Sequence, residues 1–413
     1  VDLPGNAIRL YVNPDLNSAQ SAPFNANTAL VASQAYNGNA PSTAVRFAAG
    51  TAVRWDNLVV ATTWEELRLT IVTTLDDEDD GPTSLTNPAD ISLREAVKYS
   101  PSDSLITFAA SLSGQTITLT HADGDMVIDH AFTLTVDATA LPCGITLDGN
   151  RVSQHLYVDS GESLTLRGLT ITRSQLSAVK VSGTLNAENC TFVENISSAG
   201  GAIATSRNGS MRLRHCTFTG NAALYGGAIW FFGDSHSTLT HCTFTGNHAT
   251  YGRAGGAIDL SLGSLSMTGC ILAGNYVASG IGPDFWKSYR ATLPSATNCL
   301  IGDGTGSMLT NGVDGNLLGT TAAPIDAKLS PLGYFGGPVQ TMHPLIGSPA
   351  IDAAGSIDPG GTDARGFPRF VDGDANASTA LDIGAVEAGP PPTVAFYSDA
   401  GRSGAPRGRI GPS

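Results

Sequence analysis

The chain has 413 residues, enough for two or three structural units, and only 14% of them are charged. The formal net charge of −14 excludes the basic patch on which nucleic-acid binding depends, so we expect no nucleic-acid partner. The sequence contains no run of about 18 apolar residues, so it predicts no transmembrane segment.

The first 67 residues contain two strand-like runs, Arg9 to Pro14 and Trp55 to Trp64. They resemble the end of a concanavalin-like, laminin-G-type jelly roll, and the resemblance implies a partial β-sandwich. Most of such a sandwich is absent, so carbohydrate binding is not carried over. Because the chain starts at Val1 with no apolar signal segment, we expect a processed or truncated piece of a longer protein. Residues 68–91, with the acidic run Asp76 to Pro82, are expected to be a linker.

A short helix is predicted where this linker ends. Ser92 is a good N-cap, and Glu95 stands three residues later, which is the spacing of a capping box. An amphipathic helical turn here would cover the open end of a stacked core.

From about residue 104 to about residue 310, short runs of alternating apolar and polar residues predict strands. Within this region one motif returns, as Cys190 to Asn195, Cys216 to Asn221, Cys242 to Asn247 and, less closely, Cys270 to Asn275. A period in the twenties with glycine turns and no helical pattern is typical of a solenoid. The sequence therefore predicts an all-β fold, a parallel β-helix of about eight three-strand coils within residues 92–327.

Stacking these coils in register places like residues above one another. We expect inward columns of cysteine and phenylalanine, and an asparagine column whose side chains bond to one another and to turn backbone. The predicted columns are Cys190, Cys216, Cys242 and Cys270; Phe192, Phe218 and Phe244; and Asn195, Asn221, Asn247 and Asn275.

The repeated Phe-x-x-Asn and Gly-Gly-Ala-Ile elements, such as Phe218 to Asn221 with Gly226 to Ile229, resemble those of polymorphic outer-membrane proteins and other pectin-lyase-like β-helices. That resemblance implies the same fold, a right-handed parallel β-helix. Buried free thiols are favoured for the cysteines, with disulfides as the alternative and a zinc site less favoured still. His215 and His241 also recur at the period, and we expect them to be surface residues rather than metal ligands.

The C-terminal part contains four short motifs: Gly336 to Leu345, Ser348 to Ala353, Thr362 to Arg369 and Asp382 to Glu387. Residues 328–388 resemble the choice-of-anchor Q module of bacterial surface β-helix proteins. The resemblance implies export, attachment to a cell surface and no enzymatic activity of the module. Residues 389–413 are a Pro/Gly/Arg-rich tail without the sorting signal that normally follows.

One segment of this module has oxygen-bearing side chains at alternate positions, which hard cations prefer. The candidate Ca²⁺ ligands are Asp372, Asp374, Asn376 and Asp382. Ala377 stands where an EF-hand needs glycine, so the alternative is a loop of Asx turns without an ion.

Two classes of function follow. The first is a non-catalytic, extracellular, cell-surface β-helix that acts as adhesin, stalk or filament. Its partner would be a surface polysaccharide, a protein or further copies of itself. Its candidate glycan contacts are Trp230, Phe232, Trp286 and Tyr289, for which core or lateral packing is the alternative. The alternative is a polysaccharide lyase or glycoside hydrolase, for which Asp234 and Asp259 are the candidate catalytic pair because they follow corresponding strands.

Overall fold

The computed structural model describes residues 69–81, 90–120, 124–128, 133–152, 155–206, 208–233, 236–251, 255–278, 281–355, 361–374, 376 and 379–389. It also describes two short antiparallel strand pairs nearer the termini, β1 (Arg9–Leu10) with β2 (Val60–Ala61) and β31 (Val394–Phe396) with β32 (Gly408–Ile410). The rest of the predicted β-sandwich and of the C-terminal tail lies outside the described residues.

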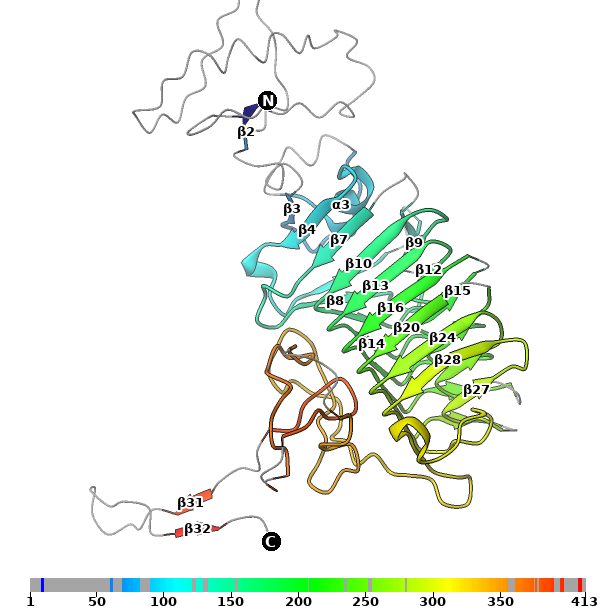
Figure 1. The fold of residues 1–413 in the computed structure, drawn as a ribbon. Helices are drawn as coiled ribbons and strands as arrows, with labels where there is room; N and C mark the ends of the chain where they lie inside the picture. The colour runs from blue at the N-terminus through cyan, green and yellow to red at the C-terminus, as the bar shows by residue number, and fades with distance from the viewer. Residues whose placement is uncertain are drawn as a thin grey trace, which may run out of the picture.

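The central body is a stack of coils in which each coil contributes one strand to each of three parallel sheets (Figure 1). We call these sheets I, II and III. Sheet I contains β3 (Leu69–Val72), β4 (Ser104–Phe108), β7 (Thr133–Asp137), β10 (Ser163–Arg167), β13 (Thr184–Glu188), β16 (Ser210–Arg214), β20 (His236–Thr240), β24 (Ser264–Thr268) and β28 (Thr292–Thr297).

Sheet II contains β5 (Thr116–Thr118), β8 (Ile145–Asp148), β11 (Leu169–Thr172), β14 (Thr191–Val193), β17 (Thr217–Thr219), β21 (Thr243–Thr245), β25 (Ile271–Leu272), β29 (Leu300–Ile301) and β30 (Leu317–Leu318). Sheet III contains β6 (Met126–Ile128), β9 (Leu156–Val158), β12 (Val179–Val181), β15 (Ile203–Thr205), β19 (Ile229–Phe231), β23 (Ile258–Leu260) and β27 (Phe285–Lys287). A short fourth ladder, β18 (Ala222–Ala223), β22 (His248–Ala249) and β26 (Tyr276–Val277), joins sheet II to sheet III.

The prediction of an all-β parallel β-helix is confirmed by this topology. In the part of the chain that the structure describes, the seven strands of sheet III mark about seven turns, against the roughly eight expected. Successive strands pair in parallel and, apart from one register shift between β24 and β28, in register, so that Phe192 lies opposite Phe218, and Phe218 opposite Phe244.

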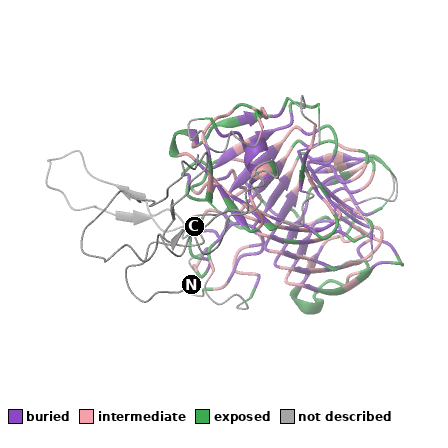
Figure 2. Cartoon of the chain, turned by 90° about the horizontal axis from the view of Figure 1, so that it is seen from above, coloured by how far each residue is buried: buried purple, intermediate pink, exposed green. Residues whose placement is uncertain are grey.

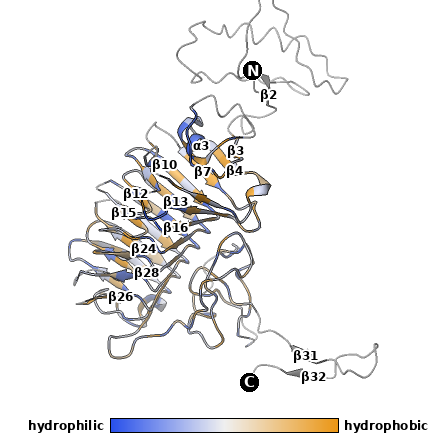
Figure 3. Ribbon diagram, turned by 180° about the vertical axis from the view of Figure 1, so that it is seen from behind, coloured by the Kyte–Doolittle hydropathy of each residue, from blue (hydrophilic) through white to orange (hydrophobic). Residues whose placement is uncertain are grey.

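The core lies between the sheets. Alternate side chains along a strand point to opposite faces, and Figure 2 shows the strands by burial and Figure 3 by hydropathy. The phenylalanine column stacks with ring centroids 4.7 and 4.5 Å apart. Five of the six cysteines are buried free thiols in this core, as predicted for the repeat, and Cys143 is exposed.

The asparagine column forms the predicted ladder. Asn221 Oδ1 accepts hydrogen bonds from the backbone N–H and the Nδ2 of Asn195, and Asn221 Nδ2 donates to Asn247 Oδ1 and to the carbonyl of Phe192. The ladder ends on Asp284, whose Oδ1 accepts from both nitrogens of Asn275. A carboxylate suits this end position because it accepts hydrogen bonds and has no donor left to satisfy.

Helix α3 (Leu93–Tyr99) covers the first coil. Its capping box is confirmed, because Ser92 Oγ accepts from Glu95 N while the Glu95 carboxylate accepts from Ser92 N. The segment expected as an acidic linker contributes strand β3 to sheet I, and it packs onto the helix. Asp77 pairs with Arg94 at 2.7 Å, and Asp79 pairs with Lys98. Two single 3-10 turns also occur, at Ala110–Leu112 and Val313–Gly315. No helix within the described ranges is both long and apolar enough to cross a membrane.

After β30 the chain folds back along the outer face of sheet II with little regular structure (Figure 1). We call the described part of residues 320–389 the C-terminal lobe. Thr191 Oγ1 donates to the Gln340 carbonyl, and Thr243 Oγ1 accepts from Ala385 N. Ile271 and Leu300 of the solenoid form a second small core with lobe residues, including Ala350 and Ile383. The lobe therefore covers sheet II rather than standing apart from it.

Candidate functional site

Aromatic side chains gather on the outside of sheet III and of the turn that leads into it. Trp230 of β19 stacks on Phe232 with ring centroids 4.7 Å apart, and Tyr225 lies 6.3 Å from Trp230 and 4.9 Å from Tyr251. Phe232 is 45% exposed and Tyr251 is 54% exposed. We call Tyr225, Trp230, Phe232, Tyr251 and Trp286 the aromatic face.

The solenoid itself shows that these rings are not needed for folding. One coil earlier, Ala204 pairs with Trp230 and Ala199 pairs with Tyr225. Both coils keep the same strands, and the inward Ile203 of the earlier coil recurs as Ile229. Large exposed apolar side chains that the scaffold does not require are typical of a binding surface.

Of the four candidate glycan contacts, the structure brings Trp230 and Phe232 into direct contact. Trp286 of β27 occupies the same outward position two coils further on, because Trp230 pairs with Asp259 and Asp259 with Trp286. Tyr289, 80% exposed, follows β27 and lies beneath the Arg290 guanidinium. The sequence reasoning missed Tyr225 and Tyr251. Both stand four residues after a ladder asparagine, Asn221 or Asn247, and that spacing could have revealed them.

Asp259, one of the two candidate catalytic residues, lies in register between Trp230 and Trp286. Its side chain is 0% exposed, and Ser261 Oγ donates to its Oδ1 at 2.7 Å. Burial raises the pKa of Asp259 to about 7 against the weaker opposite effect of the Ser261 hydrogen bond. A buried carboxyl group in this position does not touch a substrate on the surface. Asp234, its proposed partner, lies outside the described residues.

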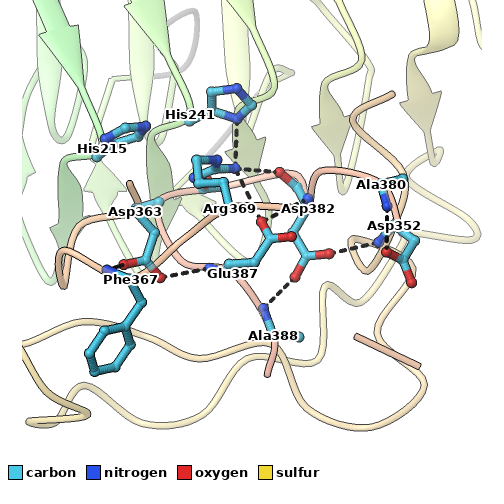
Figure 4. A network of polar contacts seen from close by, with 12 residues as sticks. His215, His241, Asp352, Asp363, Phe367, Arg369, Ala380, Asp382, Glu387 and Ala388 are labelled. Atoms are coloured by element: carbon cyan, nitrogen blue, oxygen red, sulfur yellow. Dashed lines mark hydrogen bonds and ion pairs between the residues drawn. The ribbon is translucent and has the colours of Figure 1, made fainter. Parts of the chain in front are cut away.

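A second polar group of residues lies where the C-terminal lobe meets sheet II (Figure 4). His215 and His241 occupy the corner between sheets I and II with φ of 51° and 50°, a conformation that few residues other than glycine adopt. Their rings lie 5.8 Å apart and are almost fully buried, which corrects the expectation of surface histidines. They do point out of the solenoid, but the lobe covers them. One coil later the corner residue is Gly269, where a Cβ atom would strike the His241 ring.

Arg369 joins the lobe to this corner. Its side chain is 1% exposed, and Nη2 lies 3.0 Å from His241 Nδ1 and donates to the Asp382 carbonyl at 2.7 Å. Its Nη1 donates to the Gly384 carbonyl, and Glu387 Oε2 lies 3.8 Å from Nη2 (Figure 4). Burial and then the charge of Arg369 lower the pKa of His241 to about 3, so this imidazole is neutral and accepts the hydrogen bond.

Two buried carboxyl groups accompany the guanidinium. Burial raises the pKa of Asp382 to about 6, and burial together with the charge of Asp382 raises the pKa of Glu387 to about 8. Asp382 Oδ1 accepts from Asp352 N and Oδ2 from Ala388 N, so both oxygens hold lobe backbone together. This network is a structural clamp between lobe and solenoid.

The candidate Ca²⁺ ligands divide between two places. Asp372 and Asp374 gather with Asp352, and one oxygen of each lies within 4.8 Å of the others. Asn376 lies beside them, and its backbone N–H donates to both Asp372 and Asp374. Asp382 instead lies in the buried clamp, so the structure offers Asp352 where the sequence suggested Asp382. Asp352 precedes Asp372 by 20 residues, so no local sequence pattern identifies it as a ligand of the same site.

Calcium binding here stays a prediction, and it has a direct test. Burial raises the pKa of Asp352, and the charges of Asp374 and Asp372 raise it further, so the three carboxylates repel one another. We expect millimolar Ca²⁺ to raise the thermal midpoint of the wild type and to have little effect on Asp374→Asn. Without Ca²⁺ the same variant should unfold at the same or a higher temperature. Equal Ca²⁺ effects on the wild type, on Asp374→Asn and on the exposed lobe control Asp326→Asn would contradict the prediction.

Comparison with known proteins supports the fold and leaves the function open. No curated protein and no solved structure matches the chain. Residues 143–316 match a family model described as "Right handed beta helix region", so the solenoid of this protein is similar to that family and its fold is a right-handed parallel β-helix.

Proposed function

We propose that this chain is a non-catalytic, extracellular β-helix protein that is attached to a cell surface and binds polysaccharide through its aromatic face. The observation that carries the proposal is the exchange of small side chains for aromatic ones between neighbouring coils of one scaffold. Ala199 and Ala204 become Tyr225 and Trp230 at the same register positions. Flat rings on a rigid, regular surface suit the apolar faces of successive sugar units.

The position of the C-terminal lobe supports the same proposal. The lobe packs on sheet II, while Phe232 and Tyr251 beside sheet III remain exposed. The resemblance of residues 328–388 to surface-anchor modules supports attachment at this end of the chain. In that arrangement the lobe is the attachment region and the aromatic face is the binding region.

The adjacent coil supplies the residues for a test. Trp230→Ala with Phe232→Ser copies Ala204 and Ser206, which occupy the equivalent positions one coil earlier. Affinity electrophoresis in gels that contain pectin, alginate, xylan or β-glucan would measure binding. We expect the wild type to be retarded by at least one of these polymers. The double variant should bind that polymer at least about tenfold more weakly, because aromatic hot spots commonly contribute more than about 1 kcal/mol each.

A matched control is Tyr334→Ala, which removes a 54% exposed tyrosine from the C-terminal lobe and should leave binding unchanged. Two results would overturn the proposal. One is equal retardation of the wild type and the double variant. The other is the release of new reducing ends or unsaturated sugars from any of the polymers, which would favour the enzyme alternative.

A further inference from the structure

Asp259 has a partner for only one of its two carboxyl oxygens. Ser261 Oγ donates to Oδ1, whereas Oδ2 is buried and has no hydrogen-bond partner among the described residues. Ser261 Oγ also accepts a hydrogen bond from Trp230 Nε1 at 3.3 Å. A chain of two hydrogen bonds therefore runs from the buried carboxyl group to the indole at the centre of the aromatic face.

We propose that Asp259 is a positioning residue of the aromatic face: its buried carboxyl group holds Ser261 and, through Ser261, fixes the plane of the Trp230 ring against which a sugar stacks. This inference rests on the proposed polysaccharide binding and adds to it the residue that controls the geometry of the face.

The elements around Asp259 favour the neutral form. Strand β19 presents Trp230 to it and strand β27 presents Trp286, and neither side chain carries charge. Lys287, at the end of β27, directs its ammonium to the Ser288 carbonyl at 3.3 Å. The Asp284 carboxylate accepts a hydrogen bond from Asn275 of the asparagine ladder. An ionised Asp259 would therefore need a hydrogen-bond donor at Oδ2, and because that oxygen is buried, water can reach it only if a covering group moves.

The direction of the pH effect follows from the pKa of Asp259, which burial raises from its ordinary 3.8 to about 7. A raised folded-state pKa means that the stabilisation is complete below the unfolded pKa and is lost as pH rises through the folded pKa. Below pH 6 the carboxyl group is neutral and Trp230 is held in place. Above pH 8 the carboxylate draws in water and Trp230 is released.

Tryptophan fluorescence, recorded from pH 5 to pH 9 without ligand, tests this directly. We expect the wild type to show one step with a midpoint near pH 7. Asp259→Asn, which keeps the shape and cannot ionise, should show no step, and Trp230→Phe should lose most of it. The absence of a step in the wild type would overturn the proposal. So would a full step in either variant.

Two further variants separate the hydrogen-bond chain from a general charge effect. Ser261→Ala keeps the carboxyl group but breaks the link, so the step should shrink to less than half and its midpoint should move to higher pH. An unchanged step would overturn the proposed chain. Asp137→Asn, a change on sheet I, should leave the step as it is in the wild type.

Binding of the retarding polysaccharide at pH 5.5 and pH 8.5 completes the test. We expect at least threefold weaker binding at pH 8.5 in the wild type and no difference between the two pH values in Asp259→Asn. If the fluorescence step behaves as expected while no polymer binds, the positioning role stands and the proposed function fails. If polymers bind equally at both pH values while the step is absent, the function stands and the positioning role fails.

Discussion

Replacing Asn221 by alanine should destabilise the solenoid more than any single change on its surface. The side chain makes four hydrogen bonds inside the ladder, two accepted from Asn195 and one each donated to Phe192 and Asn247. All of these groups are buried, so water cannot replace the lost partner. A buried polar group left without a partner costs about 1–3 kcal/mol. We expect the free energy of unfolding to fall by on the order of 4 kcal/mol.

Urea unfolding followed by circular dichroism would measure this as a lower denaturation midpoint. Asn186→Ala is the matched control, because Asn186 lies half-buried on the outside of sheet I and makes one long hydrogen bond, 3.4 Å to Thr165. Its loss should shift the midpoint by less than a quarter as much. If the two variants unfold at the same urea concentration, the ladder does not carry the stability assigned to it.

The ladder was predictable because the same residue returned at a fixed period, and stacking in register then determined its neighbours. Its end was not. Asp284 takes the place of the next asparagine but lies only nine residues after Asn275, outside the repeat. A sequence period predicts the residues that each coil shares with the next. It does not predict contacts made by residues outside the repeat, such as Asp284.

The same limit explains the histidines. The alternation of residues correctly predicts that His215 and His241 point out of the core. On its own it also predicts that they are exposed, which is wrong. Their cover comes from a segment without regular structure, and Arg369 meets His241 across 128 positions of sequence. No local pattern in either segment encodes that contact. The candidate metal ligands also depend on a contact between separate segments, because Asp352 reaches Asp372 and Asp374 from another loop.

The sequence carries a signal for the whole aromatic face, although an apolar run alone does not reveal it. Trp230 and Phe232 were candidates because they form an apolar run. Tyr225 and Tyr251 were not, although each follows a ladder asparagine at the same distance. What the sequence could not show is that Asp259 lies between two tryptophans, since that depends on the register of three strands.

Replacing Arg369 by methionine should release the C-terminal lobe from sheet II while leaving the solenoid folded. Methionine keeps much of the side-chain volume but removes the guanidinium that reaches His241, the Asp382 carbonyl and the Gly384 carbonyl. Hydrogen bonds that involve a charged group commonly contribute about 1.5–3 kcal/mol each. The cost of losing them falls on the lobe and on its contact with the solenoid, because the hydrogen-bond ladders of the coils do not involve Arg369.

Amide hydrogen exchange would locate the effect. Gly384 and Ala385 donate backbone hydrogen bonds to Gly269 and Thr243 of the solenoid, so their exchange should accelerate by at least about a hundredfold in Arg369→Met. Exchange in β16 and β20, on sheet I, should stay slow. The pKa of His241 should also rise from about 3 towards the ordinary value of histidine, because both the neighbouring charge and the burial are lost.

Arg167→Met is the control for loss of an arginine. Arg167 lies exposed on sheet I, with ion-pair distances of 3.5 Å to Asp137 and 3.6 Å to Glu188, and such surface pairs contribute about 0–1 kcal/mol. Its exchange pattern should match that of the wild type. Unchanged protection of Gly384 and Ala385 in Arg369→Met would mean that the apolar contacts around Ile271 and Leu300 alone hold the lobe in place. Acceleration spread evenly over sheet I would mean that lobe and solenoid unfold as one unit, with Arg369 stabilising both.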